Sequence, residues 1–297
     1  MRKIFTLILV AMLFSTLAYA QSGSNPERGR SGEAPGHQED RERDDHDDNG
    51  PVQVGWAVVT PAPVTTSAGS GTMTVAAGSS GIVVFETFGL KEGEGTMQAG
   101  LLPGDLTTSS VMFVSANGRL SRNIGIGIVN PNSAPANVTM TLRNETGGAI
   151  GAPKTILVAA GHQTAQFITS LFGDRPDVPR DLTGTLSVTS TLPVAIAGLR
   201  FRGSNFSTLP ITNLSPAAAA GVVLPHFAAG GGWATELVIV NTSTQQVNAR
   251  VDFFKQDGTA MTVRLNGESK TSFTDLTIPA GGVLELAPKD REGHSRF

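Results

Sequence analysis

The sequence of 297 residues contains no cysteine. This absence excludes a disulfide scaffold, thiolate zinc sites, iron–sulfur clusters and cysteine nucleophiles. Charged residues make up only 16% of the chain, and no apolar run beyond residue 20 reaches about 18 residues, so no later membrane span is expected. Glycine (35) and proline (17) are plentiful instead, which is typical of a turn-rich, all-β chain.

The few charges are unevenly distributed along the chain. Residues 1–20 carry a net charge of +2 and residues 21–50 carry −5, so the total of −3 leaves residues 51–297 neutral. A neutral, sparsely charged body gives no electrostatic basis for binding nucleic acid or an anionic membrane. We therefore expect neither as a partner.

The first twenty residues have the pattern of a secretory signal peptide. Arg2 and Lys3 precede an almost wholly apolar run, and Ala18-Tyr19-Ala20 places small residues at the positions that signal peptidase requires. We expect cleavage after Ala20 and a secreted or periplasmic protein. A lipid anchor is not expected, because no cysteine follows the cleavage site.

Residues 21–50 contain no Val, Ile, Leu, Met or aromatic residue, so the sequence predicts a disordered acidic linker. Within it, Asp45, Asp47 and Asn49, followed by Gly50, match the first half of a calcium-binding loop. The twelfth loop position is Trp56 instead of Glu, and no helix flanks the run. A solvated charge run is therefore favoured over a metal site, and no cofactor is expected.

From residue 51 onward, short runs of Val, Ile, Thr and Phe alternate with turn residues, a spacing that predicts β-sandwiches. One segment, Thr164–Phe172, has apolar residues at helical spacing and Gly173 as a stop, so a short helix is expected there. The predicted strands are Val54–Thr60, Gly71–Ala76, Ile82–Thr87, Val111–Ser115, Ile124–Asn130, Asn137–Arg143, Thr183–Thr189, Pro193–Arg202, Thr235–Asn241, Val247–Phe254 and Gly282–Ala287.

An internal repeat organises these strands. Ile124–Ile150 aligns with Thr235–Met261 without a gap at an offset of 111, which places Asn130 on Asn241 and Gly147 on Gly258. Asparagine suits a strand end because its side chain bonds local backbone groups, and glycine supplies the positive φ that the next turn needs. We expect a first sandwich over residues 111–215 and a second over residues 221–297.

The second copy stops before any counterpart of the strands at Thr183–Arg202. Gly55–Val64, near the start of the body, resembles that missing piece. We therefore expect residues 51–110 to form a β segment whose first part, Val54–Ala76, completes the C-terminal sandwich, either in the same molecule, which we favour, or in a neighbour by strand exchange.

Four runs of the sequence resemble a repeated β-sandwich module of large secreted proteins of environmental bacteria, notably acidobacteria. In that family an LAPKD segment is followed directly by a GWA segment, whereas here Leu286–Phe297 ends the chain and Gly55–Ala57 begins the body, which agrees with a permuted repeat register. The resemblance covers about residues 51–297 and implies two tandem immunoglobulin-like sandwiches without a known substrate. The runs are LPHFAAGGGWATELVIVNTS at Leu224–Ser243, VDFFKQDGTAM at Val251–Met261, AAGHQTAQFITSLF at Ala159–Phe172 and GTLSVTSTLPVAIAGLRF at Gly184–Phe201.

The sequence contains no serine-hydrolase elbow, zinc-protease motif, phosphate-binding loop or dinucleotide fingerprint. We expect a non-enzymatic structural or adhesion module that contacts a protein or cell-surface partner. Two alternatives remain open at this point: a glycan-binding sandwich that uses Trp56 and Trp233, the two tryptophans of the chain, and a hydrolase whose site is not recognised.

Overall fold

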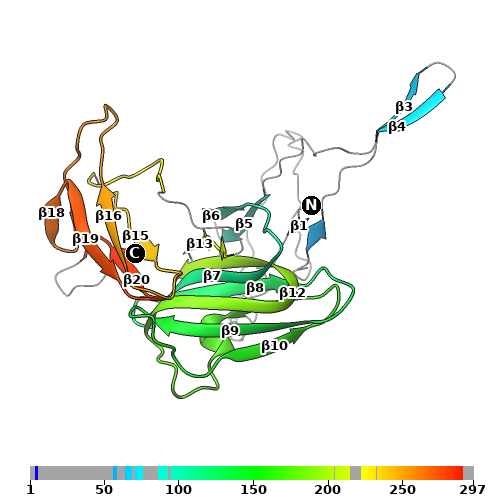
Figure 1. The fold of residues 1–297 in the computed structure, drawn as a ribbon, viewed down its shortest axis with the longest axis horizontal. Helices are drawn as coiled ribbons and strands as arrows, with labels where there is room; N and C mark the ends of the chain where they lie inside the picture. The colour runs from blue at the N-terminus through cyan, green and yellow to red at the C-terminus, as the bar shows by residue number, and fades with distance from the viewer. Residues whose placement is uncertain are drawn as a thin grey trace, which may run out of the picture.

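The computed structural model describes residues 4–5, 56–58, 64–68, 71–75, 86–92, 95–203, 205–214, 222–231 and 233–289 (Figure 1). Nearly all of its regular structure is β-strand, which confirms the all-β prediction. The predicted linker at residues 21–50, and most of the predicted signal peptide, lie outside the described residues. Within the described residues, no helix is long and apolar enough to cross a membrane.

The central unit, residues 107–213, is built around one long strand that belongs to two layers. The first half of β12 (Leu182–Arg202) pairs with β7 and β9, and its second half pairs with β8 and β13 (Figure 1). The pairing shifts between Thr189 and Val194, where Pro193 supplies no backbone N–H. The other strands are β7 (Thr107–Ala116), β8 (Arg122–Val129), β9 (Ala136–Asn144), β10 (Lys154–Val158), β11 (Gln163–Phe167), β13 (Asn205–Leu209) and β14 (Thr212–Asn213).

The core of this unit lies between the two layers. In β9, alternate residues point inward, and in β8 the inward isoleucines alternate with glycine. This period of two is the pattern expected of strands with one buried face. The inward residues of these two strands, each no more than 2% exposed, are Ala136, Val138, Met140, Leu142, Ile124, Ile126 and Ile128.

The predicted helix at Thr164–Phe172 is only half correct. Residues Gln163–Phe167 form β11, which pairs with β8, and only Ile168–Leu171 form the short helix α2. The unpaired edge of β8 outweighs a helical pattern of so few residues, because each added strand residue gains cross-strand bonds. Ile168 and Leu171 close one end of the core.

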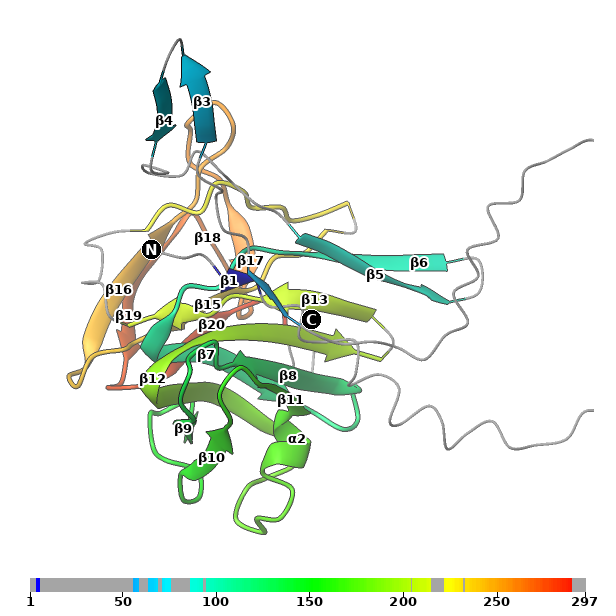
Figure 2. The same ribbon diagram turned by 90° about the vertical axis from the view of Figure 1, so that its right-hand side faces the viewer.

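A second apolar cluster covers the outer face of the layer that contains β8. There Trp56, Phe88, Leu101 and Leu106 pack against β12 residues such as Leu199. Phe88 belongs to β5 (Glu86–Glu92), which forms a hairpin with β6 (Gly95–Leu101) (Figure 2). The described contacts of this segment are therefore with the central unit, whereas the sequence led us to expect residues 51–110 at the C-terminal sandwich.

The remaining N-terminal strands are short. β2 (Ala57–Val58) pairs with β1 (Ile4–Phe5), and β3 (Val64–Ala68) pairs with β4 (Gly71–Val75). Among the described strands, none of these four pairs with the C-terminal unit. The expected completion of that unit by Val54–Ala76 within one molecule is thus not present in the described pairing.

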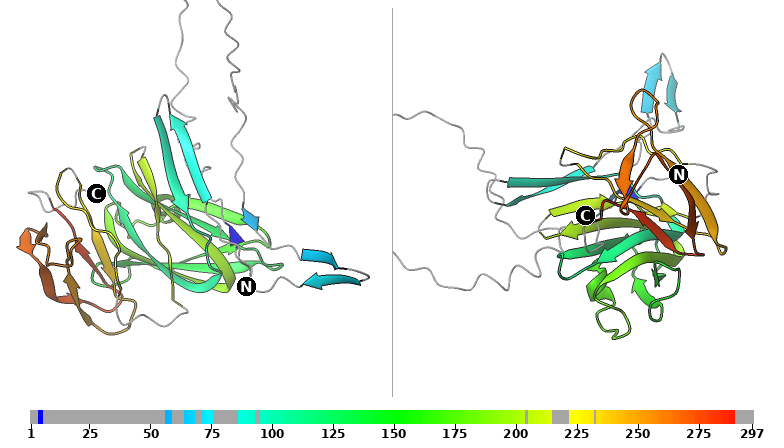
Figure 3. Two further views of the ribbon diagram at one scale, coloured as in Figure 1. Left: turned by 90° about the horizontal axis from the view of Figure 1, so that it is seen from above. Right: turned by 90° about the vertical axis from the view of Figure 1, so that its left-hand side faces the viewer.

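The C-terminal unit, residues 222–289, consists of three separate strand pairs, joined as β15–β20, β16–β19 and β17–β18. Phe253 and Phe273 form its small core, together with Leu265 and Leu286. Figure 3 shows this unit at one end of the molecule. The strands are β15 (Leu237–Val240), β16 (Val247–Asp252), β17 (Val263–Leu265), β18 (Glu268–Lys270), β19 (Ser272–Ile278) and β20 (Val283–Leu286).

Candidate interaction surface

Two buried asparagines form the same hydrogen-bond network in the two units. The Asn130 side-chain amide donates to the carbonyls of Ala134, Val158 and Ala159 at 2.8, 3.0 and 3.2 Å. The Asn241 amide donates to three carbonyls in the same way, those of Gln245, Ile278 and Pro279, at 2.7–3.1 Å. Each side-chain oxygen also accepts a bond from the backbone N–H two residues on. Both asparagines therefore fasten a strand end to the neighbouring turn.

The offset of 111 that relates Asn130 to Asn241 also relates β7 to residues 222–227, but the two segments differ sharply in exposure. Val111 and Met112 are 6% and 2% exposed, whereas their counterparts Val222 and Val223 are 80% and 90% exposed. In the central unit the first half of β12 pairs with β7 along its length. In the described part of the C-terminal unit no strand pairs with residues 222–227.

The strands β15 and β16 also have fewer described partners than their counterparts in the central unit, β8 and β9. Each of β8 and β9 is hydrogen-bonded to a strand on both of its edges, and on one edge that strand is β12. Among the described strands, β15 bonds only β20, and β16 bonds only β19. Val247 at the start of β16 is 38% exposed, while its counterpart Ala136 is fully buried. By the offset of 111, a counterpart of residues 184–190 of β12 would pair with residues 222–227 on one side and with β16 on the other; we call this position, which no described strand occupies, the open slot.

A charged cluster joins the two units. The Arg200 guanidinium on β12 donates to the Glu236 carboxylate, just before β15, at 2.9 Å, and the Glu236 side chain is only 6% exposed. Burial raises the pKa of Glu285 on β20 to about 7, and a hydrogen bond and like charge from Glu236 act in the same direction. Lys289 opposes this rise and Glu145 adds to it. This cluster forms a junction in which charged side chains are partly buried. The stability of the contact between the units therefore depends on the protonation of its carboxyl groups.

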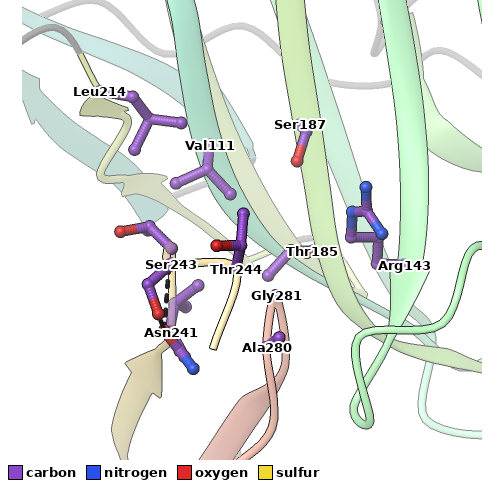
Figure 4. Close-up of a pocket in the computed structure, with 12 residues that line it drawn as sticks. Val111, Arg143, Thr185, Ser187, Leu214, Asn241, Ser243, Thr244, Ala280 and Gly281 are labelled. Atoms are coloured by element: carbon purple, nitrogen blue, oxygen red, sulfur yellow. Dashed lines mark hydrogen bonds between the residues drawn. The ribbon is translucent and has the colours of Figure 1, made fainter. Parts of the chain in front are cut away.

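The two units also meet at a cavity of about 240 Å³, which is lined by residues other than those of the charged cluster (Figure 4). Thr185 and Ser187 of β12 face Asn241 and Thr244 across it, and Arg143 lies at its side. The Arg143 guanidinium donates to the Gly147 carbonyl at 2.9 Å, so this charge already has a partner. No carboxylate or imidazole occurs among the described residues that line the cavity, so those residues offer hydroxyl and amide contacts but no general acid or base.

The two tryptophans predicted as a sugar-binding pair lie on different units. The half-buried Trp56 donates its indole N–H to the Gly161 carbonyl of the central unit at 3.2 Å and packs in the second cluster. Trp233, in the turn before β15, is 73% exposed. The candidate metal ligands Asp45, Asp47 and Asn49 lie outside the described residues. Among the residues that are described, no three metal-ligating side chains come together.

The repeat already indicated that the second copy has no counterpart of Thr183–Arg202. Sequence reasoning nevertheless missed two features of this surface. It did not single out Val222–Leu224, because an apolar run normally predicts burial. The contact between Arg200 and Glu236 joins residues 36 positions apart on different units, and no local motif marks it.

No protein-family model and no curated protein matches the chain. The Anabaena sensory rhodopsin transducer structure is 18% identical, with a TM-score of 0.26, and the overlap covers 31% of this chain and 86% of the transducer. The structure of Thermotoga maritima 1070 is 14% identical, with a TM-score of 0.27, and covers 36% of this chain and 90% of that protein. Overlaps of this size assign neither a fold family nor a function to the chain.

Proposed function

We propose that the chain is an exported, non-enzymatic structural or adhesion module that acts by protein–protein contact. The observations that carry this proposal are the run Val222–Leu224, whose three side chains are 57–90% exposed, and the strand β16, which bonds only β19 among the described strands. Isolated exposed apolar residues are ordinary, but three in a row within a unit whose strands are bonded on one side only form a recognition surface for another strand.

Two immunoglobulin-like sandwiches in tandem account for this surface. The matching networks of Asn130 and Asn241 support a common origin of the two units, and the described part of the second unit holds no counterpart of β12 that covers its strands. Such a sandwich binds a partner by completing its own sheet, so backbone bonds supply much of the contact.

Binding of the labelled exported chain to the surface of the cells that secrete it tests this function. We expect binding that is lost when those cells are treated with protease and kept when their glycans are oxidised with periodate. Val223→Lys, which places a charge in the exposed run, should weaken binding about tenfold. Leu157→Lys is the matched control, because Leu157 is 66% exposed on the central unit. Equal binding by both variants would contradict the proposal.

Glycan binding is a second candidate, because Trp233 presents an exposed ring in a turn. Trp56 is less suited to this role, since its ring packs in the second cluster and its N–H is already bonded. If glycan binding is the function, Trp233→Ala abolishes binding to polysaccharide while Trp56→Ala mainly lowers stability. Periodate-sensitive binding in the cell-surface experiment would favour this candidate over protein contact.

A further inference from the structure

The central unit shows what the open slot is missing. Residues 184–190 of β12 lie between β7 and β9, where Ser187 pairs with Val111 on one side and with Thr141 on the other. At the offset of 111, the two flanking positions become Val222 and Asp252 in the C-terminal unit. One short strand in the open slot would therefore have backbone partners on both sides, as residues 184–190 have.

We propose that the open slot is filled by residues 55–60 of a second copy of this chain, an inference that rests on the proposed function. These residues read Gly-Trp-Ala-Val-Val-Thr, and Gly184–Thr189 read Gly-Thr-Leu-Ser-Val-Thr, with the glycine, the second valine and the threonine in common. In this alignment Ala57 and Val59 replace the inward Leu186 and Val188. Pro61 then falls at the end of the strand, where the missing N–H does least harm.

The source of the strand is a second molecule because the N-terminal segment lies away from the open slot of its own chain. Trp56 is bonded to Gly161 and packs on the central unit. The hairpin of β3 and β4 projects from the opposite end of the molecule to β16 and β19, as Figures 1 and 3 both show. Trp56 must leave its contacts with the central unit before residues 55–60 can enter a slot in either molecule, but only closure within one chain also requires the segment to cross the molecule.

Residues 57–58 pair in the structure with Ile4–Phe5, which lie inside the predicted signal peptide. An exported chain without that peptide would lack this partner of β2. Because the donor and acceptor surfaces differ, each molecule both gives and receives a strand, and the assembly grows head to tail.

Disulfide trapping tests this arrangement, and the absence of native cysteine makes any trapped bond unambiguous. Val58→Cys corresponds to Ser187 and Val222→Cys to Val111, so the two thiols should face each other across neighbouring copies. The exported chain is used, with its N-terminus confirmed by mass spectrometry. Mixing the two single variants under mild oxidation should yield about tenfold more mixed dimer than Val58→Cys mixed with the control Leu157→Cys.

The double variant, Val58→Cys with Val222→Cys, separates the possible donors. A ladder of linked oligomers supports donation between copies. A linked monomer shows that the chain fills its own slot and overturns the proposal, as does the absence of any specific link. If no link forms but protease-sensitive cell binding persists, the adhesion function stands without this occupant, and if links form without cell binding, self-assembly stands without an adhesion partner.

Discussion

The central and C-terminal units place an equivalent asparagine in the same hydrogen-bond network, yet they bury their first segments very differently. Asn130 is fully buried and Asn241 is 5% exposed, so the turn that each one fastens is formed equally well. Met112 is 2% exposed and its counterpart Val223 is 90% exposed. The comparison shows that turn chemistry is decided by nearby residues, whereas burial depends on a strand that comes from elsewhere in the chain.

A lysine at the equivalent positions 112 and 223 should produce the largest difference in unfolding free energy between the two units. Met112→Lys buries an unpaired ammonium group between β12 and the core, and should cost about 4 kcal/mol or more of unfolding free energy. Val223→Lys should change the stability of the isolated chain by less than about 0.5 kcal/mol. Chemical denaturation followed by circular dichroism measures both, and equal losses would show that residues 222–227 are covered within one molecule.

The asparagine networks should respond alike. Asn130→Asp and Asn241→Asp each replace an amide, whose two N–H groups are shared among three carbonyl oxygens, with a carboxylate that faces the same oxygens, at a cost of about 3 kcal/mol. Calorimetry and limited proteolysis should show that Asn241→Asp unfolds the C-terminal unit first while the central unit remains intact. A loss below about 1 kcal/mol in only one of the two variants would break the equivalence.

Alanine substitutions at the equivalent residues Gly147 and Gly258 distinguish the cost of backbone strain in the turn from the cost of a steric clash between the two units. Gly147 and Gly258 have φ of 84° and 81°, so alanine at either position is strained by about 1–2 kcal/mol. At Gly147 the added methyl group would also overlap the Ala280 carbonyl oxygen, whereas nothing lies within 4 Å at Gly258. Gly147→Ala should therefore lower the melting temperature more than Gly258→Ala. An equal effect of the two substitutions would contradict the close approach of Gly147 to the Ala280 carbonyl.

The smallest effect concerns pH at the junction. The folded-state pKa of Glu285 is raised to about 7, so the native state holds a proton that the unfolded state releases near pH 4.5. The contribution of Glu285 to the free energy of unfolding is therefore fully present below pH 4.5 and is lost as the pH rises through 7. Between pH 5 and 8 the wild-type melting temperature should fall by about 2 °C more than that of Glu285→Gln, after allowance for solvent screening. Parallel profiles would mean that Glu285 is not the responsive group.

Local patterns in the sequence were sufficient to predict several elements of the fold. The alternation in β9 and the isoleucines of β8 gave these strands nearly to their ends. The turn-forming roles of Asn130, Gly147 and their counterparts followed from side-chain chemistry alone, because such turns depend on residues within a few positions.

Features that depend on distant residues were not predictable in the same way. Gln163–Phe167 became a strand because β8 offers an edge to it, and Val222–Leu224 stays exposed because the described C-terminal unit has no counterpart of β12. The repeat predicted that the second unit lacks a covering strand, but the exposure of Val222–Leu224 is visible only when two parts of the structure are compared. The signal peptide, the adhesion function and the glycan alternative remain predictions.

The position of β12 in the chain has a consequence for biosynthesis. Its partners β7, β8 and β9 all precede it, so they leave the ribosome, and under the proposed export the translocation channel, before the strand that joins them. Until residue 202 emerges, the central unit presents several unpaired edges at once, and a nascent chain in this state is prone to aggregation. Export that delivers the chain unfolded and releases it quickly would shorten this interval, and a pause before residue 202 would lengthen it.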